Sequence, residues 1–147
     1  MSYDLAVFEA EGVPRGDTAF VDWFNANREA VEEIEVSLPA PATSRLAAFY
    51  DEMVTRFPDM NGPSGEGIEE GDLLAGYEFQ ADHIYMDFRW SAAEGAGIQA
   101  MNLAQKHGLG MYDLISVVIF PEDDPNAPAS PTAKPSIMDW VRNLFRS

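Results

Sequence analysis

The chain has no cysteine among its 147 residues, and this absence excludes several kinds of chemistry at once. A disulfide framework, a thiolate nucleophile and a cysteine-ligated metal site all need thiols. Histidine is scarce as well, because His83 and His107 are the only two, so a zinc site would need carboxylate ligands. We therefore expect neither a metal nor a cofactor.

The motifs of common enzyme classes are also missing. The chain has no Gly-x-Ser-x-Gly elbow and no dinucleotide fingerprint. The segment Gly62-Pro63-Ser64-Gly65 predicts a turn rather than a phosphate-binding loop, since no lysine follows it. No apolar run approaches the roughly 20 residues of a membrane span, and Met1–Leu5 lacks the basic and apolar regions of a signal peptide. These absences predict a cytoplasmic protein.

Basic residues are few, with 9 Lys and Arg against 25 Asp and Glu, a net charge of -16. Such a charge disfavours binding to nucleic acid and to anionic membranes, which both need clustered cations. The excess is uneven: residues 1–72 hold 16 acidic and 4 basic residues, whereas residues 73–147 hold 9 and 5. It fits either a solvated surface or a basic protein partner.

What the chain does contain is enough apolar sequence, 46%, for one globular domain. Period-two patterns predict strands at Tyr3–Phe8, Leu73–Gln80, His83–Trp90 and Tyr112–Phe120. Helical spacing predicts helices from Asp17 to about Glu33, from Thr43 or Ser44 to Phe57, and from a Ser91–Glu94 capping box to Lys106 or His107, before Gly108. We expect an α+β fold in which the helices pack on one face of a four-stranded, mostly antiparallel sheet.

The C-terminal part has a different composition from the predicted domain at 1–120. Residues 121–135 are rich in Pro, Asp and Ala and predict an extended linker. Residues 136–147 predict an amphipathic helix whose apolar stripe consists of Ile137, Trp140, Val141, Leu144 and Phe145. We expect this helix to pack on the domain or on a second copy, which would give a homodimer.

Four polar residues alternate along the third predicted strand, namely His83, Tyr85, Asp87 and Arg89. We expect them on one wet face, where His83 and Asp87 would lie about 13 Å apart and could not hydrogen-bond. Three interpretations remain open: a solvated face, a protein-binding face, or the site of a small enzyme or ligand-binding protein. Tyr and Arg are common in binding hot spots, which favours protein binding over catalysis.

Two clusters of carboxylates are the other candidate contact sites. Glu29, Glu32, Glu33 and Glu35 crowd the end of the first helix, where the helix dipole prefers cations. Glu66, Glu69, Glu70 and Asp72 occupy the loop before the second strand. That loop could hold a hard cation such as Ca²⁺, but it lacks the EF-hand pattern. A solvated charge run and a partner-facing loop are the alternatives, and we expect a basic partner to dock on both clusters.

Three segments carry a resemblance to a known group of proteins. They are Ser2-Tyr3-Asp4-Leu5-Ala6-Val7-Phe8, Phe57-Pro58-Asp59-Met60-Asn61-Gly62-Pro63, and Trp90–Gly108 continued by Gly110-Met111-Tyr112-Asp113. Over about residues 2–113 the chain resembles a widespread group of small, acidic, largely uncharacterised bacterial proteins that look like immunity proteins of toxin systems. The linker and the terminal helix lie outside the resemblance.

The resemblance implies a binder without an active site of its own, and the charge supports the same function. An immunity protein must bind its toxin fast and tightly, and an acidic surface speeds association with a basic or phosphate-handling toxin. We therefore expect a non-catalytic protein that occludes the active site of such a toxin. A small enzyme or ligand-binding protein using the His83–Arg89 face, and a structural dimerisation module, are the alternatives.

Overall fold

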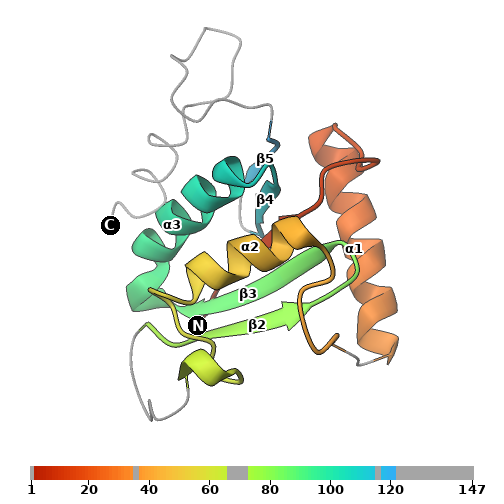
Figure 1. Cartoon of the computed structure of the whole chain (residues 1–147). Coiled ribbons are helices and arrows are strands. Elements are labelled where there is room, and N and C mark those ends of the chain that lie inside the picture. Colours follow the sequence, from red (N-terminus) through yellow and green to blue (C-terminus); the bar gives the residue numbers. More distant parts are fainter. Residues whose placement is uncertain (1, 35–36, 66–72, 115–116, 122–147) are drawn as a thin grey trace, which may run out of the picture.

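The computed structural model describes residues 2–34, 37–65, 73–114 and 117–121. In chain order the elements are β1 (Ser2–Phe8), α1 (Asp17–Ile34), α2 (Ser44–Met53), β2 (Ala75–Phe79), β3 (His83–Arg89), α3 (Ala93–Lys106), β4 (Gly110–Asp113) and β5 (Val117–Ile119). Short 3₁₀ turns lie at Pro63–Gly65 and Trp90–Ala92. The arrangement is shown in Figure 1. The predicted linker and C-terminal helix lie outside the described residues.

The sheet has five strands in the order β2-β3-β1-β4-β5, and every neighbouring pair is antiparallel. The predicted α+β class is confirmed, but four strands were expected. The difference lies in the predicted strand 112–120, because the chain reverses after β4 and pairs Asp113 with Val117. No Gly or Pro marks that reversal in Leu114–Ser116, so the β-branched composition alone predicted one continuous strand.

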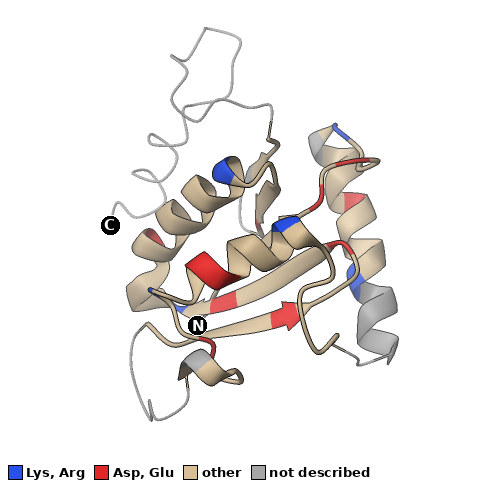
Figure 2. Cartoon of the chain, viewed as in Figure 1, with Lys and Arg blue, Asp and Glu red and all other residues tan. Residues whose placement is uncertain are grey.

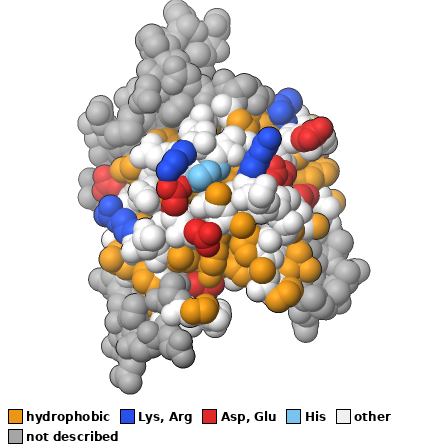
Figure 3. Space-filling view, viewed as in Figure 1, with side chains coloured by type: hydrophobic (Ala, Val, Ile, Leu, Met, Phe, Trp, Pro, Cys, Tyr) orange, Lys and Arg blue, Asp and Glu red, His pale blue; other side chains and the backbone are white. Residues whose placement is uncertain are grey.

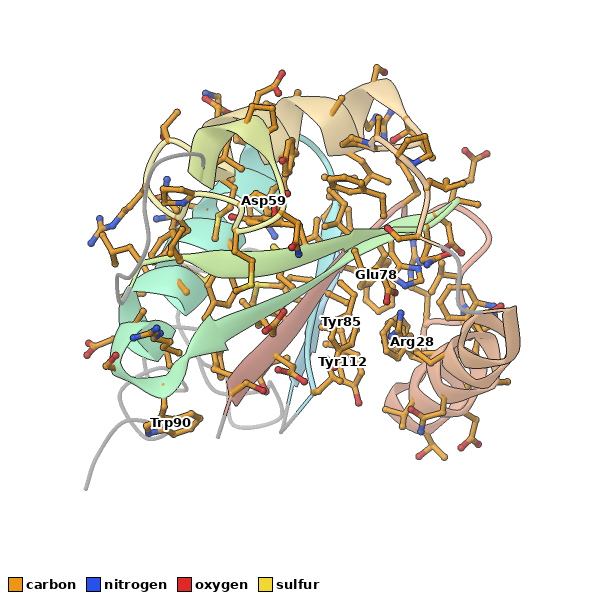
Figure 4. The ribbon with its side chains drawn as sticks, turned by 90° about the horizontal axis from the view of Figure 1, so that it is seen from below. Arg28, Asp59, Glu78, Tyr85, Trp90 and Tyr112 are labelled. Carbon is orange, nitrogen blue, oxygen red and sulfur yellow. The ribbon has the colours of Figure 1, made fainter. Side chains whose placement is uncertain are left out.

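Helices cover both faces of the sheet, and the prediction that they pack on one face is wrong. Tyr3, Leu5 and Val7 of β1 point into the larger core, which α2 and α3 cover. Ala6 and Phe8 point into a smaller core on the opposite face. Phe20 and Phe24 of α1 fill this smaller core, so α1 lies across the sheet from the other two helices, as Figure 4 shows from below.

Helix α2 begins where the sequence predicts and ends earlier. Thr43 is its N-cap and accepts a 3.2 Å hydrogen bond from the Leu46 backbone N–H. Leu46, Phe49 and Met53 repeat at helical spacing and are fully buried against the sheet. The chain leaves the helix after Met53, although the predicted end, Phe57, is fully buried in the same core.

Small side chains let α3 approach the sheet closely. Its buried face is made largely of alanine and glycine: Ala93, Ala96, Gly97, Ala100 and Ala104. The Ser91–Glu94 capping box is not formed, because Ser91 lies in the 3₁₀ turn and the N-cap is Ala92, which makes no side-chain cap. The predicted C-terminal glycine is confirmed. Gly108 has φ +69, and the N–H groups of Gly108 and Leu109 bond to Gln105 and Ala104.

The outer edge of β2 is largely covered by two loop segments. At one end the Leu38 N–H donates to the Phe79 carbonyl at 2.8 Å. At the other end the Met60 N–H donates to the Ala75 carbonyl, and the Ala75 N–H donates to Pro58, both at 2.9 Å. Two loops that are distant in sequence are therefore fixed along the same edge strand.

Candidate functional site

His83 lies beneath α1 rather than on a wet surface, so the expectation of an open face at this residue is wrong. Its side chain is 3% exposed and packs against the ring of Phe24, with ring centroids 5.5 Å apart. Nδ1 lies 2.7 Å from Oδ1 of Asp82, whose pKa this hydrogen bond lowers. Nε2 is buried and has no hydrogen-bond partner within the described part of the chain. His83 therefore has no access to a substrate or a partner.

Arg28 reaches from α1 onto the sheet and joins two residues there. Its guanidinium lies 4.2 Å from the ring centroid of Tyr85 and forms an ion pair with Glu78. Burial alone would raise the pKa of Glu78, but the hydrogen bond and charge of Arg28 lower it below its ordinary value. Figure 4 shows Arg28, Glu78 and Tyr85 pointing toward one another. Sequence patterns did not indicate this role for Arg28 or Glu78.

Tyr85 also links this group to a pair of carboxylates. Its hydroxyl donates a 2.6 Å hydrogen bond to Oδ2 of Asp4, and the Ser2 hydroxyl donates to Oδ1 at 2.8 Å. Asp4 is the direct cross-strand neighbour of Asp87 in the β1–β3 register. Burial and then the charge of Asp4 raise the pKa of Asp87. Burial and the bond to Asp4 likewise raise the pKa of Tyr85.

The four predicted face residues therefore separate into different environments. Tyr85 and Asp87 are half-buried and lie next to Asp4, Arg89 is exposed at the end of β3, and His83 is covered by α1. The Tyr85 proton is engaged with Asp4, so the phenol is not a free acid. A general acid–base pair formed by His83 and Tyr85 would need both groups at one accessible surface, and the two lie in different environments.

The two acidic clusters fall largely outside what the structure describes. The backbones of Glu29, Glu32 and Glu33 belong to the end of α1. Glu35, together with Glu66, Glu69, Glu70 and Asp72, lies outside the described residues. Within the described ranges no three His, Asp or Glu side chains are grouped so that they could hold a metal ion.

In the sequence, both clusters nevertheless stand within a few residues of a surface that is described. Leu38, Met60 and Leu73 are 37%, 51% and 46% exposed, and they are three of the four exposed large apolar side chains found in the described residues. Backbone hydrogen bonds fix Leu38 and Met60 to β2, and Leu73 lies just before it. We call these three residues the β2-edge surface. Figure 3 shows hydrophobic side chains gathered on the same side of the molecule as α2.

An aromatic group and a buried carboxylate support this surface from behind. The Tyr50 ring meets Tyr77 and Phe79 edge-on at 5.2 and 5.0 Å. The Tyr50 hydroxyl donates to Oδ2 of Asp59 at 2.8 Å, and Oδ1 accepts from the Asn61 N–H at 2.9 Å. Asp59 is 3% exposed. The segment Phe57–Pro63 is therefore a structural support for the loop at Met60.

Cations are dispersed over separate elements, as Figure 2 shows. On the α2–α3 face, Lys106 lies 2.5 Å from Oε1 of Glu52, and His107 bonds to the second oxygen of the same carboxylate. Side chains of both signs are visible on this face in Figure 3. The hydrogen bonds from Lys106 and His107 lower the pKa of Glu52. The described part of the chain shows no basic patch of the kind that nucleic acid needs.

Comparison of the chain with family models, with curated proteins and with solved structures finds no match. Among the described helices, none combines the length and the apolar character that crossing a bilayer requires.

Proposed function

We propose that this chain is a non-catalytic protein-binding protein of the immunity type, which neutralises a bacterial toxin in the cytoplasm by occluding the toxin's active site. One observation carries the proposal. Three of the four exposed large apolar side chains of the described residues lie on the β2-edge surface, and in the sequence a run of carboxylates precedes Leu38 and another precedes Leu73. Large apolar groups that gather in one place on a protein commonly mark an interaction site.

Along the sequence, each acidic run stands just before residues of this surface, which supports the proposal. The run Glu29–Glu35 ends shortly before Ser37 and Leu38, which bond to the end of β2. The run Glu66–Asp72 is followed directly by Leu73, which lies two residues before the start of β2. An apolar centre within a charged rim is the usual composition of a specific interface.

The sign of the charge indicates a basic partner. The net charge is -16, and described cations such as Arg28 and Lys106 are already paired with carboxylates. Such a field attracts a positively charged protein and raises its association rate. Toxins that act on nucleic acids or phosphate esters have basic active sites, which an acidic surface can cover.

A small enzyme on the His83–Arg89 face has less support. His83 is buried under α1, and the Tyr85 hydroxyl is bonded to Asp4. Use of His83 in catalysis would therefore require α1 to move away from the sheet.

The test is co-expression with the product of any toxin gene found beside this one, followed by measurement of binding kinetics. The chain should rescue growth, and association should slow as salt rises, because exposed charges are screened beyond about 8–10 Å at 0.1–0.15 M. Replacing Glu66, Glu69 and Glu70 by Gln together with Asp72→Asn should lower the on-rate several-fold. Met60→Ser with Leu73→Ser should mainly raise the off-rate.

A matched variant separates a local effect from a change in net charge. Glu11→Gln, Asp22→Asn, Asp51→Asn and Glu94→Gln remove the same number of charges from exposed positions that are not part of the β2-edge surface or of the two acidic runs. This control should leave most of the on-rate unchanged. Equal slowing by both variants would exclude docking at the β2-edge surface, and failure to bind or to rescue growth would overturn the immunity function.

A further inference from the structure

Helix α1 covers only one end of the sheet face on which it lies. Its Phe20 and Phe24 rings contact Tyr112, and Phe20 also contacts Phe8 and Phe120. No described helix covers the other end of this face. That open end is formed by Ser2, Asp4, Asp87, Arg89 and Leu114, of which Ser2 and Arg89 are exposed and the others half-buried. Figure 4 shows α1 confined to one end of the sheet.

The open end places two carboxylates side by side. Asp4 and Asp87 are direct cross-strand neighbours, a pairing in which like charges destabilise a sheet. On the next strand Gly76 faces Asp87, and a Cβ added to Gly76 would come within 2.0 Å of Oδ1 of Asp87. Strand β2 therefore contributes no side chain that could shield this carboxylate. A cationic group placed over the pair would relieve the repulsion.

The C-terminal part of the same chain has the complementary composition. Residues 125–147 hold three basic residues and one acidic residue, a net charge of +2, whereas residues 1–124 hold 6 basic and 24 acidic residues, a net charge of -18. Of its two arginines, Arg142 lies within the predicted stripe 137–145 and Arg146 directly follows it. This segment can therefore offer cations and apolar side chains together.

The length of the connecting chain permits the segment to reach the open end. The described chain ends at Pro121, just after β5, and residues 122–135 follow before Ser136. An extended chain spans up to about 3.3 Å per residue, so this stretch can cover roughly 45 Å. Asp4 lies on β1, two strands from β5, and neighbouring strands are about 4.8 Å apart. The required distance is much shorter than the available length.

We propose that residues 136–147 bind the open end of the α1-side sheet face within the same chain. Arg142 and Arg146 pair with Asp4 and Asp87, and the apolar stripe lies against Leu114 and Tyr85. The β2-edge surface lies at the outer edge of the sheet and stays accessible. The inference does not depend on the proposed function.

Paramagnetic relaxation tests this contact, and the absence of native cysteine makes the labelling unambiguous. A nitroxide attached to Ser147→Cys in the ¹⁵N-labelled full chain should reduce the amide peaks of Asp4, Asp87 and Leu114 at least twofold relative to the reduced label. Amides of Arg45 and Asp51 on α2 should keep their intensity, since α2 covers the opposite face. Unchanged peaks at the open end, or losses confined to α2, would overturn the proposal.

A mixed sample distinguishes the same chain from a second copy. Protein that carries ¹⁵N but no nitroxide is mixed with protein that carries the nitroxide but no ¹⁵N. The total protein concentration is the same as in the single sample. The open-end peaks should then stay unchanged. If they lose intensity in the mixture as strongly as in the single sample, a second copy occupies the face and the intramolecular contact is refuted.

Charge variants test the proposed pairing from both sides. Arg142→Gln with Arg146→Gln leaves the body of the protein untouched and should restore the peak intensities. Asp4→Asn with Asp87→Asn should do the same, whereas the control pair Asp22→Asn with Asp51→Asn, exposed positions on α1 and α2, should not. Persistent twofold losses in the arginine variant would show that these cations do not hold the segment.

Discussion

The phenol of Tyr3 donates a 2.6 Å hydrogen bond to Oδ2 of Asp113, and both side chains are fully buried. The bond joins the first strand to β4 inside the larger core, across 110 positions of sequence. Burial, together with the charge and hydrogen bond of Asp113, raises the pKa of Tyr3. A carboxylate in such a place needs its hydrogen bonds, because an unsatisfied buried acceptor retains its full desolvation cost.

Tyr3→Phe should therefore lower the free energy of unfolding by about 1–3 kcal/mol, because the buried carboxyl of Asp113 loses this donor. Urea denaturation at pH 7 measures the difference. Tyr112→Phe is the matched control, since the described residues offer no hydrogen-bond partner to the Tyr112 hydroxyl. A Tyr3→Phe variant as stable as the Tyr112→Phe variant would contradict the importance of the Tyr3–Asp113 bond.

Gly97→Ala should be destabilising although alanine favours helices. A Cβ at Gly97 would lie 3.1 Å from the Tyr3 hydroxyl oxygen, which is buried and bonded and cannot move away. Gly95→Ala, in the same helix, would meet Arg56 and Phe57 at ordinary distances of 3.5 and 3.8 Å. The control should gain up to about 1 kcal/mol from helix propensity. In the Tyr3→Phe background Gly97→Ala should become neutral or stabilising; simple additivity in this double-mutant cycle would rule out the contact.

Glu52→Gln should lower the melting temperature at pH 7 and have no effect in acid. The pKa of Glu52 is depressed in the folded chain, first by the Lys106 hydrogen bond and then by that of His107. Its stabilising contribution is therefore complete above the ordinary value of 4.5 and disappears as the pH falls through the lower folded value. Asp51→Asn, the exposed neighbour, controls for the loss of one charge. Thermal melts between pH 7 and pH 2 measure this difference in melting temperature between Glu52→Gln and the parent. A difference that did not depend on pH would refute the ion-pair cluster.

Gly65→Ala should destabilise the chain by about 1–3 kcal/mol, the usual effect of overpacking. A Cβ at this position would come within 2.2 Å of the Asp59 backbone oxygen, which cannot rotate away as a side chain could. Gly16→Ala should stay within about 0.5 kcal/mol of the parent, because its Cβ would meet Ala19 at 3.7 Å. Chemical denaturation of the two variants side by side is the measurement, and equal stabilities would exclude tight packing around Asp59.

Local sequence patterns predict most of the helices and strands, because the start and end of each element depend on residues that are close in sequence. The Thr43 cap and the Gly108 ending were identified for this reason, and so was the hairpin of β2 and β3. The side of the sheet on which α1 packs is not a local property. A signal for it is present in β1, where Ala6 and Phe8 are apolar as well as Leu5 and Val7, a pattern typical of a strand buried on both faces.

The candidate site was predictable only in part for the same reason. Alternation on β3 correctly places Tyr85 and Asp87 on one face. It gives no information about Asp4, which register brings opposite Asp87, or about Arg28, which a distant helix places over Tyr85. The burial of His83 likewise follows from Phe24 of α1, and no pattern within His83–Arg89 could reveal that contact.

The central position of β1 has a consequence for synthesis of the chain. Ser2 pairs with Arg89 and Leu5 pairs with Asp113, so both neighbours of the first strand emerge from the ribosome long after it. At about 5–20 residues per second, β1 waits on the order of 5–15 s for β3 alone. During that time an apolar strand is exposed with both edges unpaired. Pairing of β1 therefore cannot begin before β3 emerges, and ribosome-associated chaperones should protect Tyr3–Phe8 in particular during this interval.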